Sequence, residues 1–153
     1  MKSVKTGARP FGPPMIGALL RVPLEAVHRH MLERLHENGF EDFDQAYLPL
    51  LHYPGPQGLR PTDLAAQLGI SKQALNYLLR ELERLDYLER EPHPDDLRAK
   101  RIVLTDRGAA AALVIRDAVR EMEAHWKKQV GAKRFAELRA LLVELSEPAE
   151  LNP

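Results

Sequence analysis

The sequence predicts a mostly α-helical protein with one small β hairpin, and three observations lead to this fold class. Apolar residues recur at three- and four-residue spacing along most of the 153 residues, as in helices with one buried face. Residues 87–105 instead combine two short β-prone runs with a Pro- and Asp-rich linker. The hydrophobic fraction of 44% and the charged fraction of 29% are those of a folded chain. A chain of this length fits one domain, about residues 15–147, between short tails.

The composition excludes several kinds of site and location. The chain has no cysteine, which excludes disulfides, thiolate nucleophiles and cysteine zinc sites and makes the cytoplasm the expected location. "MIGALL" is too short for a signal peptide, and no apolar stretch reaches the length of a membrane span. The 22 basic and 22 acidic residues balance, so a nucleic-acid partner would have to be attracted by local charge.

The N-terminal part is expected to contain a tail and two helices. Residues 1–14 are rich in Gly, Pro and Lys and predict a flexible basic tail, although an arm that touches DNA stays open. Helical spacing over residues 15–38 predicts a helix that ends at Gly39, and Pro23 predicts a kink or a break into two pieces. A second helix is expected from about Asp42 to His52.

Residues 60–85 predict two helices joined by a tight turn. Pro61 suits the first position of one helix, Gly69 its end, and Ser71 the N-cap of the next. On this next helix an apolar arc is formed by Ala74, Leu75, Leu78, Leu79, Leu82 and Leu85. The opposite arc over residues 71–80 has hydroxyl, amide, basic and tyrosine side chains but no acid: Ser71, Lys72, Gln73, Asn76, Tyr77 and Arg80. Such side chains donate to phosphates and base edges, so the pair of helices predicts a helix-turn-helix whose second helix contacts DNA.

The segment after this helix predicts a wing. "YLERE" and "KRIVLT" are β-prone, and the linker between them indicates a hairpin loop too long for a two-residue turn. Arg98, Lys100 and Arg101 follow one another without an acid between them, which gives the hairpin a local positive charge. A winged helix-turn-helix over about residues 42–105, with these three residues on DNA, is therefore expected.

The C-terminal part predicts two helices that need a partner. Thr105 suits the N-cap of a long helix to Val130, whose apolar stripe is expected to consist of Leu113, Val114, Ala118, Met122 and Trp126. A last helix, about residues 133–146, carries a stripe formed by Phe135, Leu138, Leu141, Leu142 and Leu145. A second copy of the chain would cover these stripes, so we expect dimerisation helices at about residues 15–39 and 106–147, followed by a tail at 148–153.

The order of these elements resembles the MarR family of bacterial transcriptional regulators over about residues 15–147. The most specific mark is D-x-R followed by L-T, present as Asp96, Arg98, Leu104 and Thr105. The resemblance implies a homodimer on a pseudo-palindromic double-stranded DNA operator, with Arg98 in the minor groove and Asp96 positioning it. It also implies a repressor whose DNA binding responds to a small anionic or aromatic effector. Asp86 departs from the family pattern, since glycine is common at this position, and Arg60 replaces the usual Ser or Thr cap.

Other functions were weighed against this one. The sequence has no G-x-S-x-G, H-E-x-x-H or cysteine nucleophile, so we expect no enzyme and no cofactor. A metal-responsive regulator is an alternative, but His28 and His30 are two residues apart and point to different sides of a helix, so no metal site is expected. A winged helix that binds a protein is the other alternative. An apolar outer face would favour it, but Tyr77 is the only apolar residue expected on this face.

The effector site is left unassigned by the sequence. Five residues are candidates for the lining of a cavity, but each is equally suited to the core or its boundary: Arg21, Tyr47, His52, Tyr53 and Trp126.

Overall fold

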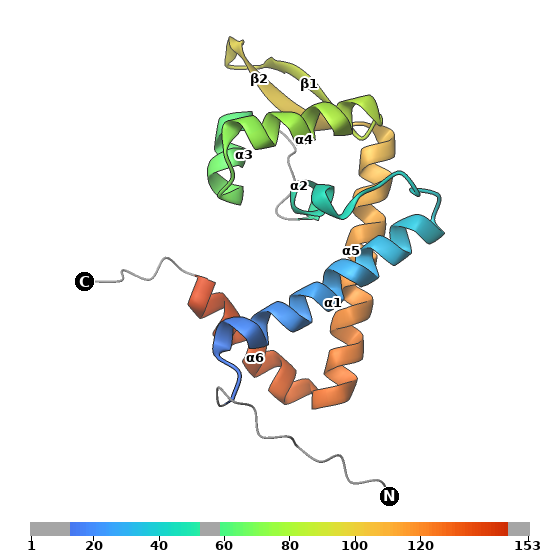
Figure 1. Ribbon diagram of the computed structural model, residues 1–153, viewed down its shortest axis with the longest axis vertical. Coiled ribbons are helices and arrows are strands. Elements are labelled where there is room, and N and C mark those ends of the chain that lie inside the picture. Colours follow the sequence, from blue (N-terminus) through green and yellow to red (C-terminus); the bar gives the residue numbers. More distant parts are fainter. Residues whose placement is uncertain (1–12, 53–58, 147–153) are drawn as a thin grey trace, which may run out of the picture.

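The computed structural model describes residues 13–52 and 59–146, in which a winged helix lies at one end of a long helix (Figure 1). The long helix is α5, which α1 crosses and from whose C-terminal end α6 folds back. The elements in chain order are α1 (Ile16–Glu37), the 3-10 turn η1 (Gln45–Tyr47), α2 (Leu48–His52), α3 (Pro61–Leu68), α4 (Lys72–Arg84), β1 (Leu88–His93), β2 (Asp96–Leu104), α5 (Asp106–Val130) and α6 (Ala132–Ser146). The predicted fold class, mostly α with a small β wing, is confirmed. No helix of the described residues could cross a membrane.

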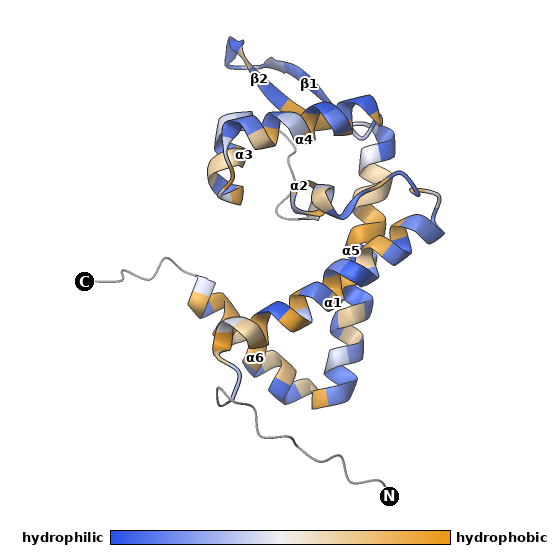
Figure 2. Ribbon diagram, viewed as in Figure 1, coloured by the Kyte–Doolittle hydropathy of each residue, from blue (hydrophilic) through white to orange (hydrophobic). Residues whose placement is uncertain are grey.

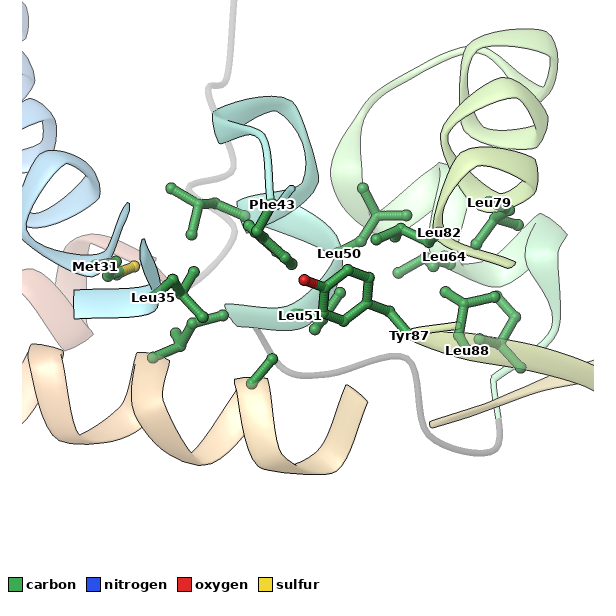
Figure 3. Packing of buried hydrophobic residues seen from close by; sticks show 14 of the residues in the cluster. Met31, Leu35, Phe43, Leu50, Leu51, Leu64, Leu79, Leu82, Tyr87 and Leu88 are labelled. Atoms are coloured by element: carbon green, nitrogen blue, oxygen red, sulfur yellow. The ribbon is translucent and has the colours of Figure 1, made fainter. Parts of the chain in front are cut away.

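One apolar core runs from α1 to the wing, and Tyr87 lies between its two parts (Figure 3). Met31 and Leu35 of α1 pack near α5, while Leu79 and Leu82 of α4 pack beyond Tyr87. The buried Tyr87 ring meets Phe43 edge-on, with centroids 5.2 Å apart. Because interiors pack closely and deform little, this core fixes α4 relative to α5.

The helix-turn-helix begins and ends where its sequence predicts. Pro61 occupies the first turn of α3, and Gly69 ends it with a φ of 64°. Ser71 caps α4, since its hydroxyl accepts a hydrogen bond from the Ala74 amide at 3.1 Å. Asp86 follows α4 with a φ of 63°, the left-handed backbone that the family pattern implies at this position.

The N-terminal helices differ from the expectation in two respects. Pro23 does not break the first helix, because α1 is continuous from Ile16 to Glu37. Pro23 cannot donate to the Leu19 carbonyl, but both residues are exposed, so water can bind that oxygen. The second helix does not begin at Asp42: residues 42–44 are not helical, and Asp44 instead caps η1 by accepting from the Ala46 amide at 2.8 Å.

The apolar faces of α4 and α5 differ from the predicted ones at single positions. Ala74 is exposed on α4 and Leu78 is only partly buried, whereas Leu75, Leu79 and Leu82 are buried. On α5, Leu113 is 53% exposed. The buried α5 face consists of smaller or β-branched residues, at Gly108, Ala111, Ile115 and Ala118. Short side chains let α5 approach Tyr87 closely. The predicted stripe of large apolar residues did not include these positions, apart from Ala118.

The expected long hairpin loop is also wrong, because the strands extend further than their β-prone runs. β1 reaches His93 and β2 begins at Asp96, which leaves a two-residue turn at Pro94 and Asp95. The register changes from Pro92 opposite Lys100 to His93 opposite Asp96. Residues 97–99 therefore form a bulge in β2 without Cα partners in β1.

Candidate nucleic-acid interface

The candidate residues of α4 lie together on its outer surface. Five of them are exposed, namely Ser71, Lys72, Gln73, Tyr77 and Arg80, while Asn76 is partly buried. Tyr77 is the most prominent, with 66% of its surface exposed. No acidic residue occurs between positions 71 and 80, so this part of α4 offers hydrogen-bond donors without a repelling charge.

Asn76 is oriented from the wing rather than from α4 alone. Arg90 of β1 donates to the Asn76 amide oxygen at 3.4 Å and to Glu83 at 3.0 Å. Arg90 Nε also lies 2.9 Å from the other Glu83 oxygen, which is an ion-pair distance but not a hydrogen bond. This cluster joins the middle of α4 to β1. Arg90 is seven residues from Glu83 and fourteen from Asn76, so the sequence alone does not indicate this cluster.

The wing carries Arg98 in the β2 bulge. Asp96 accepts a hydrogen bond from the Arg98 backbone amide at 3.1 Å, so the carboxylate fixes the main chain before the arginine. Leu97 stands next to Arg98 and is 81% exposed, an apolar side chain at the wing tip that the sequence analysis did not single out. The bulge turns this short segment away from the ladder of the hairpin.

The two basic residues at the base of the wing differ in their surroundings. Arg101 pairs with Glu91 directly across the hairpin, with Nη2 2.8 Å from Oε2. Lys100 is exposed and lies opposite Pro92. The local positive charge expected from these residues is therefore reduced at Arg101, because strand pairing brings together residues ten positions apart.

Below the wing, a polar junction joins α5 to the end of α4. Tyr87 donates its hydroxyl hydrogen to Asp42 at 2.6 Å, and Arg107 donates to both Asp42 oxygens at 2.9 and 3.0 Å. Burial and the hydrogen bond to Asp42 raise the pKa of Tyr87 well above its usual range. Burial opposes ionisation of Asp42, but the hydrogen bonds from Tyr87 and Arg107 outweigh it and lower the pKa of this carboxyl.

The same junction holds the backbone after α4 in place. Arg107 also donates to the Leu85 carbonyl, and the Thr105 hydroxyl donates to the Asp86 carbonyl at 2.5 Å. Thr105 caps α5 as predicted, because its oxygen accepts from the Gly108 amide at 3.0 Å. The end of α4 and the start of α5 are thereby one rigid joint.

The remaining candidates have ordinary structural partners. His30 contacts Glu121 at 2.8 Å, and no group of three or more His, Asp or Glu in the described part of the chain could hold a metal ion. Arg21 pairs with Glu25 on an exposed part of α1, and Tyr47 meets Phe43 edge-on at 5.5 Å. Trp126 is partly buried against the core. The side chains of His52 and Tyr53 lie outside the described residues.

The winged helix is similar to one known family. Residues 42–99, from the α1–α2 connection to the wing tip, match the MarR family. The chain thus matches this family over its winged helix. Its fold is similar to that of a MarR transcriptional regulator from Methanosarcina mazei Go1, with a TM-score of 0.70 at 17% identity over 85% of this chain and 92% of that one.

Two further proteins resemble the chain. The structure of the MepR–DNA complex from S. aureus has a TM-score of 0.65 at 23% identity, over 87% of this chain and 97% of that one. An HTH-type transcriptional regulator of Bacillus subtilis (strain 168), YkoM, is 33% identical over 84 residues, which are 55% of this chain and 53% of YkoM. The match thus spans about half the length of this curated relative.

Proposed function

We propose that this chain is a MarR-family, sequence-specific, DNA-binding transcriptional regulator that acts as a homodimer. The observation that carries the proposal is the outer surface of residues 71–80, which has no acidic side chain and lies beside a wing whose Arg98 is presented on a bulge. The fold shared with the MepR–DNA complex supports it, as does the match to the regulator YkoM. A regulator of this kind is not an enzyme, and its partner, chromosomal DNA, is in the cytoplasm.

In this proposal α4 enters the major groove. The amides of Gln73 and Asn76 suit adenine edges, and Arg80 suits guanine, because these side chains match the donors and acceptors of the base edges. Ser71 and Lys72 lie at the start of α4 and suit phosphates, which fix position but carry no sequence information. Tyr77 is assigned to a base edge.

The wing is assigned to the neighbouring minor groove. Arg98 would reach into it, since a narrow minor groove concentrates negative potential, and Asp96 would act as its positioning residue. Lys100 would contact a phosphate directly. Arg101 would contact a phosphate while still paired with Glu91. We therefore expect Arg101 to contribute less to the affinity for DNA than Lys100 does.

Exposed apolar side chains support the proposed homodimer. Figure 2 shows hydrophobic residues along the N-terminal half of α1 and along α6. Leu19 is 51% exposed, Leu141 56% and Leu145 73%. A single chain leaves this surface in water, and a second copy would bury it, so we assign α1, α5 and α6 to dimerisation. A two-fold dimer requires a pseudo-palindromic operator.

Regulation by a small effector completes the proposal. The family resemblance supports a repressor that an anionic or aromatic molecule releases from DNA, and no residue is assigned to that molecule. The basic tail of residues 1–14 and the domain boundaries near residues 15 and 147 likewise belong to this proposal.

The test is selection of genomic fragments by the purified protein, followed by footprinting of the recovered DNA. We expect an inverted repeat with half-sites about 10 base pairs apart, in keeping with adjacent major grooves. The double variant Gln73→Ala, Asn76→Ala serves as the control and should recover fragments without a common motif. Recovered DNA that lacks a motif for the unaltered protein would contradict the proposal and favour a winged helix that binds a protein.

A further inference from the structure

The polar surface of α4 contains an apolar hollow. Ala74, Tyr77 and Leu78 line it, together with Ser71 and Gln73 at its edge. Ala74 belongs by sequence spacing to the buried face, yet the structure leaves it exposed in the middle of the candidate interface. Phosphates are bound by hydrogen-bond donors, which the side chains of Ala74 and Leu78 lack, so phosphate binding does not account for this hollow.

Tyr77 separates the apolar hollow from a polar one. The second hollow is lined by Gln73, Asn76, Tyr77 and Arg80. Gln73 and Tyr77 border both hollows. One ligand can therefore place an apolar group in the first hollow and a hydrogen-bonding group in the second. An A·T base pair has this combination in the major groove: adenine offers N7 and the N6 amino group, and thymine offers its 5-methyl group.

We propose that the hollow formed by Ala74, Tyr77 and Leu78 is a subsite for the 5-methyl group of one thymine in each operator half-site. Gln73 bonds to adenine beside it, in the same or the adjacent base pair. The inference rests on the proposed DNA binding and adds the base that is read. Lys72 and Arg80 favour DNA as the occupant over a basic or neutral protein surface. Residues 71–80 contain no carboxylate that would repel a phosphate.

The size of the effect follows from the burial of one methyl group. Moving one such group out of water changes affinity by about fourfold, given the usual transfer free energy of a buried carbon. The contribution is uncharged, so it leaves the salt dependence of binding unchanged, unlike the loss of a phosphate contact.

The test replaces each thymidine of the operator in turn by deoxyuridine, which lacks only the 5-methyl group. We expect about fourfold weaker binding at one position in each half-site and no change in the slope of affinity against salt. The same thymidine and deoxyuridine operators are then measured with Tyr77→Ala, Tyr77→Phe and Leu113→Ala. The ratio of the two affinities within one variant cancels any general loss of stability or DNA binding.

Tyr77→Ala should bring the ratio close to one, because the wall of the hollow is lost. Tyr77→Phe keeps the ring and should retain the ratio, as should Leu113→Ala, which changes an exposed leucine of α5. If the unaltered protein prefers its operator to random DNA but no thymidine position responds, the subsite is wrong and the proposed function stands. If the ratio persists in Tyr77→Ala, the methyl group acts through DNA shape and the assignment to this hollow is overturned. If no operator exists, both proposals fail.

Discussion

The Arg107 guanidinium carbon lies 4.4 Å from the centroid of the Tyr87 ring, which it stacks on while holding both oxygens of Asp42. The three side chains come from the start of α5, the residue before β1 and the connection after α1. Cation–π attraction and charge-assisted hydrogen bonds act together here, although Arg107 and Asp42 are each about one-third exposed. The position of the winged helix on α5 therefore depends on this junction.

Arg107→Ala should lower the free energy of unfolding by about 1 to 3 kcal/mol. It removes the charged donor to Asp42, which keeps only the Tyr87 hydroxyl, and it also removes the donor to the Leu85 carbonyl. Arg107→Lys should recover less than half of the loss, since an ammonium group cannot bind both oxygens and stack as well. Urea unfolding followed by circular dichroism measures both changes. Arg120→Ala is the control, because it removes an exposed ion pair to Asp117. Equal stabilities for Arg107→Ala and Arg120→Ala would contradict this role.

Acid should weaken the same junction through Asp42. The pKa of this carboxyl is lower in the folded protein than its usual value of 3.8, so its stabilising contribution is present above that value. The contribution is lost as the pH falls through the lower, folded pKa. Asp42→Asn should therefore be less stable than the unaltered protein at pH 7, and the difference should shrink by pH 3. Urea unfolding at the two pH values tests it; a difference that stays constant would show that Asp42 does not act through its charge.

Gly108→Ala should destabilise the protein although alanine is the better helix former. A Cβ atom at position 108 would lie 1.7 Å from the Tyr87 carbonyl oxygen, so α5 would have to move away from the junction. We expect a loss of more than about 2 kcal/mol in the free energy of unfolding. Gly17→Ala is the matched control, because nothing lies within 4 Å of its Cβ position in α1, and it should stabilise by up to about 1 kcal/mol. The prediction is wrong if both variants are equally stable.

These contacts mark the limit of what the sequence could predict. Local signals were sufficient for the caps at Ser71 and Thr105, because each depends on its immediate neighbours. The left-handed Asp86 was indicated only by the glycine that is common at this position in the family the chain resembles. The Asp42–Tyr87–Arg107 junction joins positions 45 and 65 residues apart, and its members are a surface acid, an aromatic residue and a basic residue by sequence. Nothing in their spacing indicates that the chain brings them together.

Within the candidate interface the same distinction holds. The periodicity of α4 predicted most of its exposed side, but it assigned Ala74 to the buried side, because this position lies at the border of the apolar arc. The Arg101–Glu91 pair required knowledge of the hairpin register, which the β-prone runs alone did not define.

Two variants separate dimerisation from folding. Leu141→Glu places a charge on the exposed apolar surface of α6 and should convert a dimer of twice 17.3 kDa into a monomer. Leu97→Glu, also at an exposed leucine but on the wing, should leave the dimer intact. Light scattering at micromolar concentration reads the mass, and circular dichroism checks that the helices persist. A monomeric mass for the unaltered chain would refute the assignment of α1, α5 and α6.

The wing residues should differ in how they respond to salt. Arg98→Ala should weaken operator binding tenfold or more, because it removes a minor-groove contact. Lys100→Ala should weaken operator and random DNA together and reduce the salt slope by about one. Glu91→Gln should act in the opposite direction, since it frees Arg101 for a phosphate and steepens the slope. Salt titrations of affinity compare the variants, and four identical lines would exclude the wing from DNA binding.

The pairing of arginines inside the winged helix also affects how the protein would search for its operator. Arg84, Arg90 and Arg101 each lie within 3 Å of a glutamate, so their fields largely cancel beyond a Debye length of about 8 Å. An approaching duplex is then attracted weakly until α4 and the wing are almost in place. We expect association rates near the unsteered range of about 10⁵ to 10⁶ M⁻¹ s⁻¹ and brief sliding on random DNA. Such a protein finds its operator mainly by repeated collisions from solution. Occupancy of the operator then depends more on the protein concentration than on the length of the flanking DNA.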